Sequence, residues 1–507
     1  MQLRALSAAF VVLLVLPVSC GGPSRHDLDQ TIEQAVEDWG ISGLAVGIVK
    51  DGSAVHLRGY GYCDIEEKIP IDGDTIFGIG STSKAFGAAL IGVLVHEDKL
   101  DWEDKVIDHL PDFQLADPYV TRELTVRDLL CHRSGVQTND AIFFGSVGRD
   151  EIVYKARFLE QVAGVRTRFD YHNIMILTAG QVAARVLGTT WDEAVQEKIF
   201  EPLGMDRSCT SISDLDSYTN VSAPHTWKGG NLVRVPWLNV DNTGPAGCIN
   251  SSASDMARWI QAHLNDGSFD RHEIWGADVQ REMFSPHTIM PRPMLGRLAD
   301  STHFGLYGLG WMMHEYRGKK LVYHGGATDG MGAFVAMVPE ENLGVVVLSN
   351  TIQTPLLSSL GYRIIDAYLG VPDSEWSLPG PAKRTEGASG EVQEAGAARA
   401  PSVPLVRMTG VYSHPIFEAV EVGLENGKLV MNFDIYPTAT LEHRDLDTFK
   451  MGFDSHISSM WDSVFGRGFD VTFHVDANAH VSELSISPVF GDFTRVECEI
   501  LNPAPPT

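Results

Sequence analysis

The sequence GSTSKAFGAALIGVLV (residues 80–95) decides how this chain is interpreted, because it places Ser81 three residues before Lys84. A helix brings side chains three residues apart onto the same face. The small, apolar run from Ala85 to Val95 predicts a helix that is buried all round. Burial lowers the pKa of an ammonium group, so Lys84 could take the proton from the weakly nucleophilic hydroxyl of Ser81. The segment therefore predicts a serine nucleophile beside a lysine base.

Two later segments could complete such a site. The sequence YHN (residues 171–173) precedes an apolar stretch, so Tyr171 and Asn173 are expected on a loop just before a helix, pointing into one cleft. The sequence LVYHGG (residues 321–326) predicts a short strand that ends in two glycines, where a backbone edge can pair with substrate. Each of these two segments is weak evidence alone, because Tyr-x-Asn is usually turn chemistry and a single histidine is usually structural.

In this order and spacing, the three motifs resemble those of the serine β-lactamase and penicillin-binding-protein superfamily. The resemblance is strongest to its class C-like branch, with D-aminopeptidases, family VIII esterases and penicillin-binding-protein-4-like hydrolases. Three further segments resemble this branch: LTVRDLLCHRSGV (124–136), EPLGM (201–205) and AGCINSSASDMA (246–257). The resemblance implies one hydrolase domain over residues 27–372, with an α+β fold in which an antiparallel sheet is flanked by helices and by a helical subdomain.

The resemblance also implies a covalent acyl-enzyme mechanism. Ser81 would attack a carbonyl carbon, and Lys84 and Tyr171 would share the proton transfers, with either of them as the working base. Asn173 would hydrogen-bond Lys84 and the substrate amide. Backbone N–H groups of Ser81 and of the strand after His324 would form the oxyanion hole. No metal and no other cofactor is expected.

The third motif departs from the Lys-Thr-Gly of β-lactamases. It consists of His324, Gly325 and Gly326, so it has no hydroxyl, and an imidazole with an ordinary pKa of about 6.5 is mostly neutral at pH 7. A fixed cation is missing, and so is a hydrogen bond to the substrate carboxylate, worth about 1.5–3 kcal/mol. These three residues and Asn173 are the candidate substrate-binding residues. The departure favours small amides or esters, such as D-amino-acid peptides or short-chain esters, over β-lactams.

Two alternative functions stay open at this point. A peptidoglycan DD-peptidase, a penicillin-binding protein or a weak β-lactamase would share the first two motifs, but it would have to bind a terminal carboxylate. A catalytically idle binding or structural homologue would keep the fold without the reaction. A metallohydrolase and an α/β-hydrolase are disfavoured, because the sequence contains neither His-x-His-x-Asp nor Gly-x-Ser-x-Gly.

The start of the chain and its charge indicate where the protein acts. Residues 1–20 predict a secretory signal, because their apolar run is too short to span a bilayer. Cys20 is a candidate lipidation site, so the protein is expected to be extracytoplasmic, either secreted, periplasmic or lipid-anchored. The net charge of −27 argues against nucleic acid and anionic membrane surfaces as partners. The remaining five cysteines have no metal-binding spacing and are expected to be mostly buried free thiols.

Turn signals predict how the rest of the chain is organised. An Asp-Gly pair at residues 51–52 predicts an early hairpin, and two apolar runs at 333–338 and 344–349 predict late strands of the same sheet. The composition of residues 377–404 predicts a flexible linker. The short β-type runs of residues 405–501 resemble the lipocalin-like barrel appended to many of these hydrolases. The sequence does not predict an oligomeric state.

Overall fold

The computed structural model describes most of the chain between Arg25 and Arg495. The predicted signal, Cys20 and most of the predicted linker lie outside the described residues. The described ranges are 25–144, 147–228, 230–291, 302–352, 354–372, 398–433, 436–453, 469–487 and 491–495.

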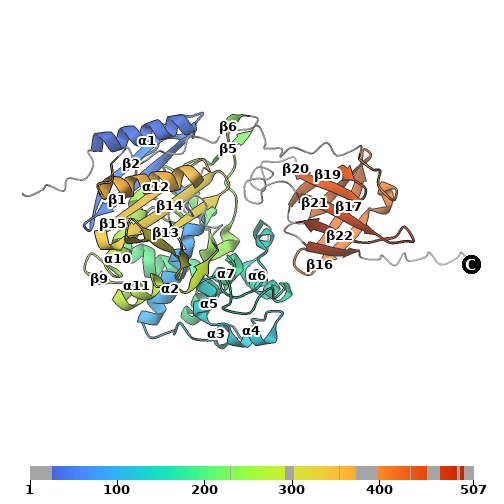
Figure 1. Ribbon diagram of the computed structural model, residues 1–507, viewed down its shortest axis with the longest axis horizontal. Helices are drawn as coiled ribbons and strands as arrows, with labels where there is room; N and C mark the ends of the chain where they lie inside the picture. Colours follow the sequence, from blue (N-terminus) through green and yellow to red (C-terminus); the bar gives the residue numbers. More distant parts are fainter. Residues whose placement is uncertain are drawn as a thin grey trace, which may run out of the picture.

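A nine-stranded antiparallel sheet is the centre of the first part of the chain (Figure 1). Its early hairpin turns at Asp51 and Gly52, which both have positive φ, as the Asp-Gly pair predicts. The first strand of this hairpin pairs on its other side with a late strand, so that Leu44 lies opposite Ser349. The strand order is β10 (Thr288–Met290), β11 (Gly305–Tyr307), β12 (Met312–Tyr316), β13 (Lys319–Thr328), β14 (Met331–Val338), β15 (Leu343–Ser349), β1 (Gly43–Lys50), β2 (Ser53–Asp64) and β3 (Ile69–Pro70).

Helices cover both faces of this sheet. α1 (Arg25–Trp39) and α12 (Thr354–Tyr368) share one apolar cluster with β1, β14 and β15. The opposite face packs against α10 (Ala253–Leu264) and, beyond it, against α2 (Ser83–His96). Because both faces are covered, every residue of β14 is buried and its sequence is a continuous apolar run.

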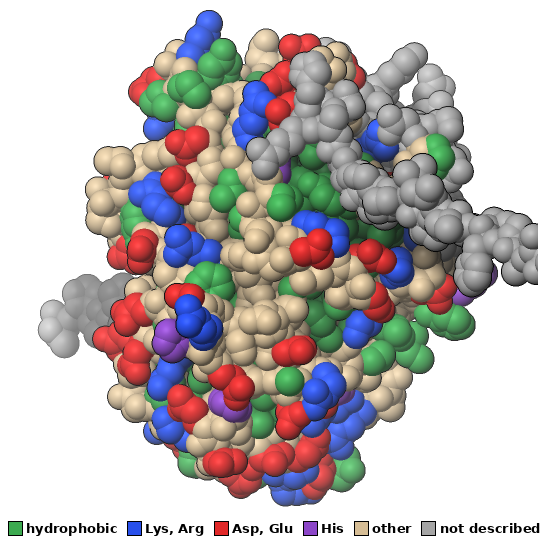
Figure 2. Space-filling view, turned by 90° about the vertical axis from the view of Figure 1, so that its left-hand side faces the viewer, with side chains coloured by type: hydrophobic (Ala, Val, Ile, Leu, Met, Phe, Trp, Pro, Cys, Tyr) green, Lys and Arg blue, Asp and Glu red, His purple; other side chains and the backbone are tan. Residues whose placement is uncertain are grey.

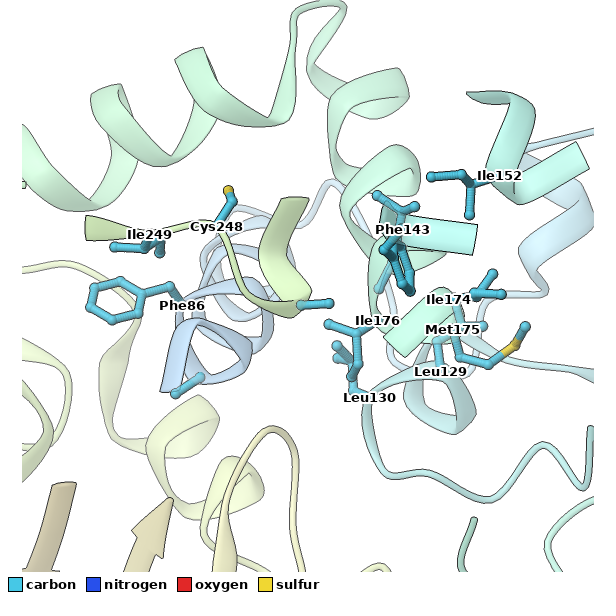
Figure 3. Close-up of a cluster of buried hydrophobic side chains, with 14 of the residues drawn as sticks. Phe86, Leu129, Leu130, Phe143, Ile152, Ile174, Met175, Ile176, Cys248 and Ile249 are labelled. Carbon is cyan, nitrogen blue, oxygen red and sulfur yellow. The ribbon is translucent and has the colours of Figure 1, made fainter. Parts of the chain in front are cut away.

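The helical subdomain lies on the far side of α2 (Figure 1). Its centre is α7 (Asn173–Leu187), which packs against α2 and α5 (Val126–Leu130). Figure 3 shows this region: Leu130 of α5 and Ile176 of α7 lie close together, whereas Phe86 of α2 points to the other side of its helix and stacks on Trp259 of α10. Burial of α2 from Ser83 to Leu94 confirms the prediction that this helix is enclosed all round. α2, which begins two residues after Ser81, therefore lies between the sheet and the subdomain.

The shorter elements complete this part of the chain. They are α3 (Val106–His109), α4 (Pro118–Glu123), α6 (Arg149–Lys155), α8 (Trp191–Val195), α9 (Glu201–Leu203), α11 (Gly276–Met283), and the paired strands β4 (Ile76–Gly78) with β7 (Asn250–Ser252), β5 (His225–Lys228) with β6 (Asn231–Arg234), and β8 (Ser268–Phe269) with β9 (His272–Glu273). Acidic and basic side chains are interspersed over the face shown in Figure 2.

The last part of the chain is a closed eight-stranded barrel. Its β17–β18 hairpin turns at Asn426 and Gly427, again with positive φ at both residues. The barrel domain begins before residue 405, because Arg399 forms an ion pair with Asp445 and the side chain of Val403 is buried. The strands are β16 (Gly410–His414), β17 (Glu418–Glu425), β18 (Lys428–Phe433), β19 (Tyr436–Asp445), β20 (Thr448–Phe453), β21 (Phe469–Val475), β22 (Val481–Ser487) and β23 (Gly491–Arg495).

Two further findings concern cysteines and membranes. The four cysteines within the described residues, Cys63, Cys131, Cys209 and Cys248, are free and buried, as the sequence predicts. Among the described helices, none has both the length and the apolar character needed to cross a bilayer.

The barrel strands hydrogen-bond to one another in a closed ring, and all candidate catalytic residues precede the barrel. We therefore predict that a protein consisting of residues 23–387 folds and still reacts with a fluorophosphonate at Ser81. The break is placed within residues 383–390, because their sequence is polar and new chain ends are best tolerated in polar segments. Circular dichroism reports folding and intact-mass spectrometry reports labelling. A folded truncation that no longer labels would mean that the barrel helps to build the site.

Candidate active site

Ser81 lies in a tight turn, Gly80–Thr82, that leads from β4 into α2. Gly80 has a φ of +51°, and a Cβ atom there would lie 2.5 Å from the backbone nitrogen of Ala327 in β13. Only glycine combines this backbone conformation with so close an approach. The turn is therefore pressed against β13, and it leaves the side chain of Ser81 partly exposed.

Lys84 is completely buried one helical turn after Ser81. Its Nζ lies 2.9 Å from Ser81 Oγ and 2.7 Å from the carbonyl oxygen of Ala246. Both of these contacts are with neutral groups, so burial dominates and lowers the lysine pKa to about 7, although the nearby Asp140 carboxylate acts in the opposite direction. A neutral amine at this distance can accept the hydroxyl proton of Ser81.

The ring of Tyr171 lies beside this amine. Lys84 Nζ is 4.6 Å from the ring centroid, and the tyrosine hydroxyl interacts with Ser81. Burial raises the pKa of Tyr171 above its ordinary value of 10, and the contact with Ser81 offsets only part of this shift. The structure thus brings together the three predicted catalytic side chains. Because a phenolate would be costly here, the electrostatics favour Lys84 over Tyr171 as the base.

Asn173 is the first residue of α7, whereas the sequence predicted it on the loop just before this helix, and its hydrogen bond also differs from the expected one. Its Nδ2 donates to Asp140 Oδ2 at 2.8 Å, whereas the sequence predicted a bond to Lys84. Burial raises the pKa of Asp140, while the charge of Lys84 and the Asn173 amide act in the opposite direction. Sequence reasoning missed Asp140. Its one local signal is a carboxylate directly before the apolar residues 141–144.

His324 is buried in β13 with both ring nitrogens engaged. Nδ1 lies 2.6 Å from the carbonyl oxygen of Gly325, and Nε2 lies 3.1 Å from the hydroxyl of Tyr307. A carbonyl oxygen only accepts, so Nδ1 carries the proton and Nε2 accepts from Tyr307. Burial lowers the pKa of His324 to about 3, with the charge of Lys84 as a further cause. The ring is therefore neutral, and it has no free nitrogen for the substrate contact that the sequence predicted.

The two glycines after His324 differ in their surroundings. A Cβ atom on Gly326 would lie 1.9 Å from the carbonyl oxygen of Ile79 and 3.0 Å from the backbone nitrogen of Ser81. A Cβ atom on Gly325 would meet only the carbonyl oxygen of Ala333, at 3.9 Å. Gly326 thus lets the β13 backbone lie against the N–H of Ser81, which is where the sequence predicts the oxyanion hole.

Comparisons with known proteins find similarity over both parts of the chain. The Beta-lactamase family matches residues 28–369, and a Domain of unknown function (DUF3471) matches residues 394–499. The Unguisins hydrolase ungD of Aspergillus violaceofuscus is 29% identical over 455 residues, which cover 80% of this chain and 78% of that protein. Penicillin-binding protein 4 of Amycolatopsis lactamdurans is 25% identical over 351 residues, covering 67% and 89% of the two chains.

A solved structure shares the fold. The octameric penicillin-binding protein homologue from Pyrococcus abyssi aligns with a TM-score of 0.63 at 23% sequence identity. The alignment covers 93% of this chain and 100% of the other. At this identity the likeness concerns the fold alone.

The depressed pKa of Lys84 predicts a pH-dependent rate. We expect kcat/KM for p-nitrophenyl butyrate to rise as the pH increases through about 7, because the amine must lose its proton before it can act as the base. Burial lowers the pKa of His172 to about 4 and that of His324 to about 3, so neither imidazole titrates in this window. A flat profile between pH 6 and pH 8 would contradict the assignment of Lys84 as the base.

Proposed function

This chain belongs to the Beta-lactamase family, and from that premise we propose that it is a serine hydrolase that forms an acyl-enzyme at Ser81. The observation that carries the proposal is the 2.9 Å distance between the buried Nζ of Lys84 and Ser81 Oγ. The pKa near 7 shows that burial of Lys84 has a large desolvation cost. An apolar residue at this position would give the same structural benefit without that cost. This cost argues against the alternative of a catalytically idle homologue.

The proposed reaction proceeds in two halves. The oxygen of Ser81 attacks the substrate carbonyl carbon while its proton passes to Lys84. Backbone N–H groups at Ser81 and in β13 stabilise the oxyanion, and the leaving amine or alcohol takes a proton from Lys84 or Tyr171 as its bond to carbon breaks. Water then attacks the ester carbonyl at Ser81, which releases the acid and returns the proton to the serine. The sum is hydrolysis of one amide or ester bond.

We propose small amides or short-chain esters as substrates. His324 is neutral and its nitrogens are engaged with Gly325 and Tyr307, so the third motif offers no fixed cation for a substrate carboxylate. The lack of a cation supports the hypothesis of a peptidase or esterase. A DD-peptidase, penicillin-binding protein or β-lactamase would need a cationic contact to the substrate carboxylate. A relative named as a hydrolase of unguisins supports hydrolysis as the reaction type. The predicted signal in residues 1–20 supports an extracytoplasmic location, with Cys20 as a candidate anchor.

Intact-mass spectrometry with two probes tests this proposal. A fluorophosphonate should add once, at Ser81, and a penicillin should label the same residue far more slowly, because its carboxylate finds no cation at His324.

Ser81→Ala should abolish labelling, and Tyr171→Phe should lower kcat for p-nitrophenyl butyrate by about two to four orders of magnitude. Full hydrolytic activity in the Ser81→Ala protein would overturn the proposed function. Rapid, stoichiometric labelling by penicillin would instead favour the penicillin-binding alternative.

A further inference from the structure

The two backbone N–H groups on either side of Tyr171 both donate to one residue, His132. The N–H of Asp170 donates to the backbone carbonyl oxygen of His132 at 2.9 Å. The N–H of His172 donates to Nδ1 of the His132 ring at 3.0 Å. The peptide segment that carries Tyr171 is thus held at two points, and one of these two points is a side-chain atom.

The His132 ring also packs directly on the tyrosine. The centroids of the His132 and Tyr171 rings are 4.4 Å apart and the planes are tilted by 36°. On its other sides the imidazole contacts Tyr307 at 4.6 Å and Phe169 at 5.4 Å. Tyr307 is the residue whose hydroxyl reaches His324. His132 therefore fixes both the backbone and the ring of Tyr171, and it links the second motif to the third.

From these contacts we propose that His132 is a positioning residue, which holds the Tyr171 hydroxyl in register with Ser81 and Lys84. The proposal rests on the proposed function, because it concerns proton transfer at the same site. His132 is completely buried and acts through Tyr171, so it is not a catalytic residue itself.

The backbone and the proton state of His132 suit this role. Its φ of +59° lies in the left-handed region, where histidine and asparagine occur more often than most other non-glycine residues. Because Nδ1 accepts from a backbone N–H, the ring must be neutral with its proton on Nε2. Burial and the charge of Lys84 both hold the pKa of His132 well below 6.5, with smaller contributions from His324 and His172. The accepting nitrogen is therefore available throughout the working pH range.

Two substitutions separate the accepting atom from general packing. His132→Asn keeps an acceptor near the position of Nδ1 and tolerates the left-handed backbone, whereas His132→Leu has the same branched shape as asparagine and no acceptor. We expect His132→Leu to lower kcat for p-nitrophenyl butyrate on the order of 100-fold with KM little changed, the usual effect of a misplaced catalytic group. His132→Asn should keep most of the wild-type kcat. Equal losses in the two variants would overturn the proposal.

A double-mutant cycle with Tyr171→Phe tests whether the effect passes through the tyrosine. Once the tyrosine hydroxyl is gone, its position no longer affects the rate. In the Tyr171→Phe background, His132→Leu should therefore lower kcat by less than about threefold. The same loss in both backgrounds would overturn the inference. If His132→Leu does not fold, His132→Gln, which moves its amide oxygen one carbon further from the backbone, takes its place in the cycle with the same expectations.

His314 offers a matched control. It is another buried histidine of this domain, and its Nε2 lies 3.3 Å from the hydroxyl of Tyr362 in α12. His314→Leu should lower the melting temperature and leave kcat unchanged, whereas a fall in kcat equal to that of His132→Leu would point to loss of stability as the common cause. Failure of the proposed function would appear as activity in Ser81→Ala. Failure of the present inference would leave the Ser81→Ala result unchanged. It would appear as equal losses in His132→Leu and His132→Asn, or as additive losses in the double-mutant cycle.

Discussion

The enclosure of the Lys84 amine is the constraint on which the rest of this structure depends. Its Nζ is sealed from water between Ser81 Oγ and the carbonyl oxygen of Ala246. Keeping a charged ammonium there is costly, and this cost brings the pKa close to neutrality. Such enclosure requires a helix that is buried on every side. α2 meets this requirement because it lies between the sheet and the helical subdomain, whose apolar side chains meet around it (Figure 3).

The site around this amine is assembled from distant parts of the chain. Gly80 and Gly326 let the turn before α2 and the strand β13 approach to backbone contact, which brings two unrelated segments together at Ser81. Tyr171 comes from the loop before α7, and His132 anchors that loop from the end of α5. The hydroxyl of Tyr307 reaches the buried ring of His324. Each contact limits where its neighbour can lie, so the site is positioned by packing and by backbone hydrogen bonds in addition to its reactive groups.

Local sequence patterns predicted much of the fold and part of the site. Turn chemistry identified the hairpin at 51–52, because positive φ at Asp-Gly is a local property. The apolar run after Lys84 correctly predicted a fully buried helix. The partner of Asn173 was predicted wrongly and Asp140 was missed, because the contact between them depends on how a loop folds back onto α7. The same holds for His132, whose motif was recognised while its partners in the loop before α7 were not visible in the sequence.

The central claim is that Lys84 is neutral when the enzyme works, and its direct test is a titration of this one amine. Protein labelled with carbon-13 at the lysine Cε positions can be followed by NMR between pH 5 and pH 11, with the Lys84 signal assigned by its loss in Lys84→Arg. The account predicts that this signal titrates near pH 7, well below the value of about 10.4 for a lysine side chain in a model peptide. A Lys84 signal that titrates near this reference value would contradict the account.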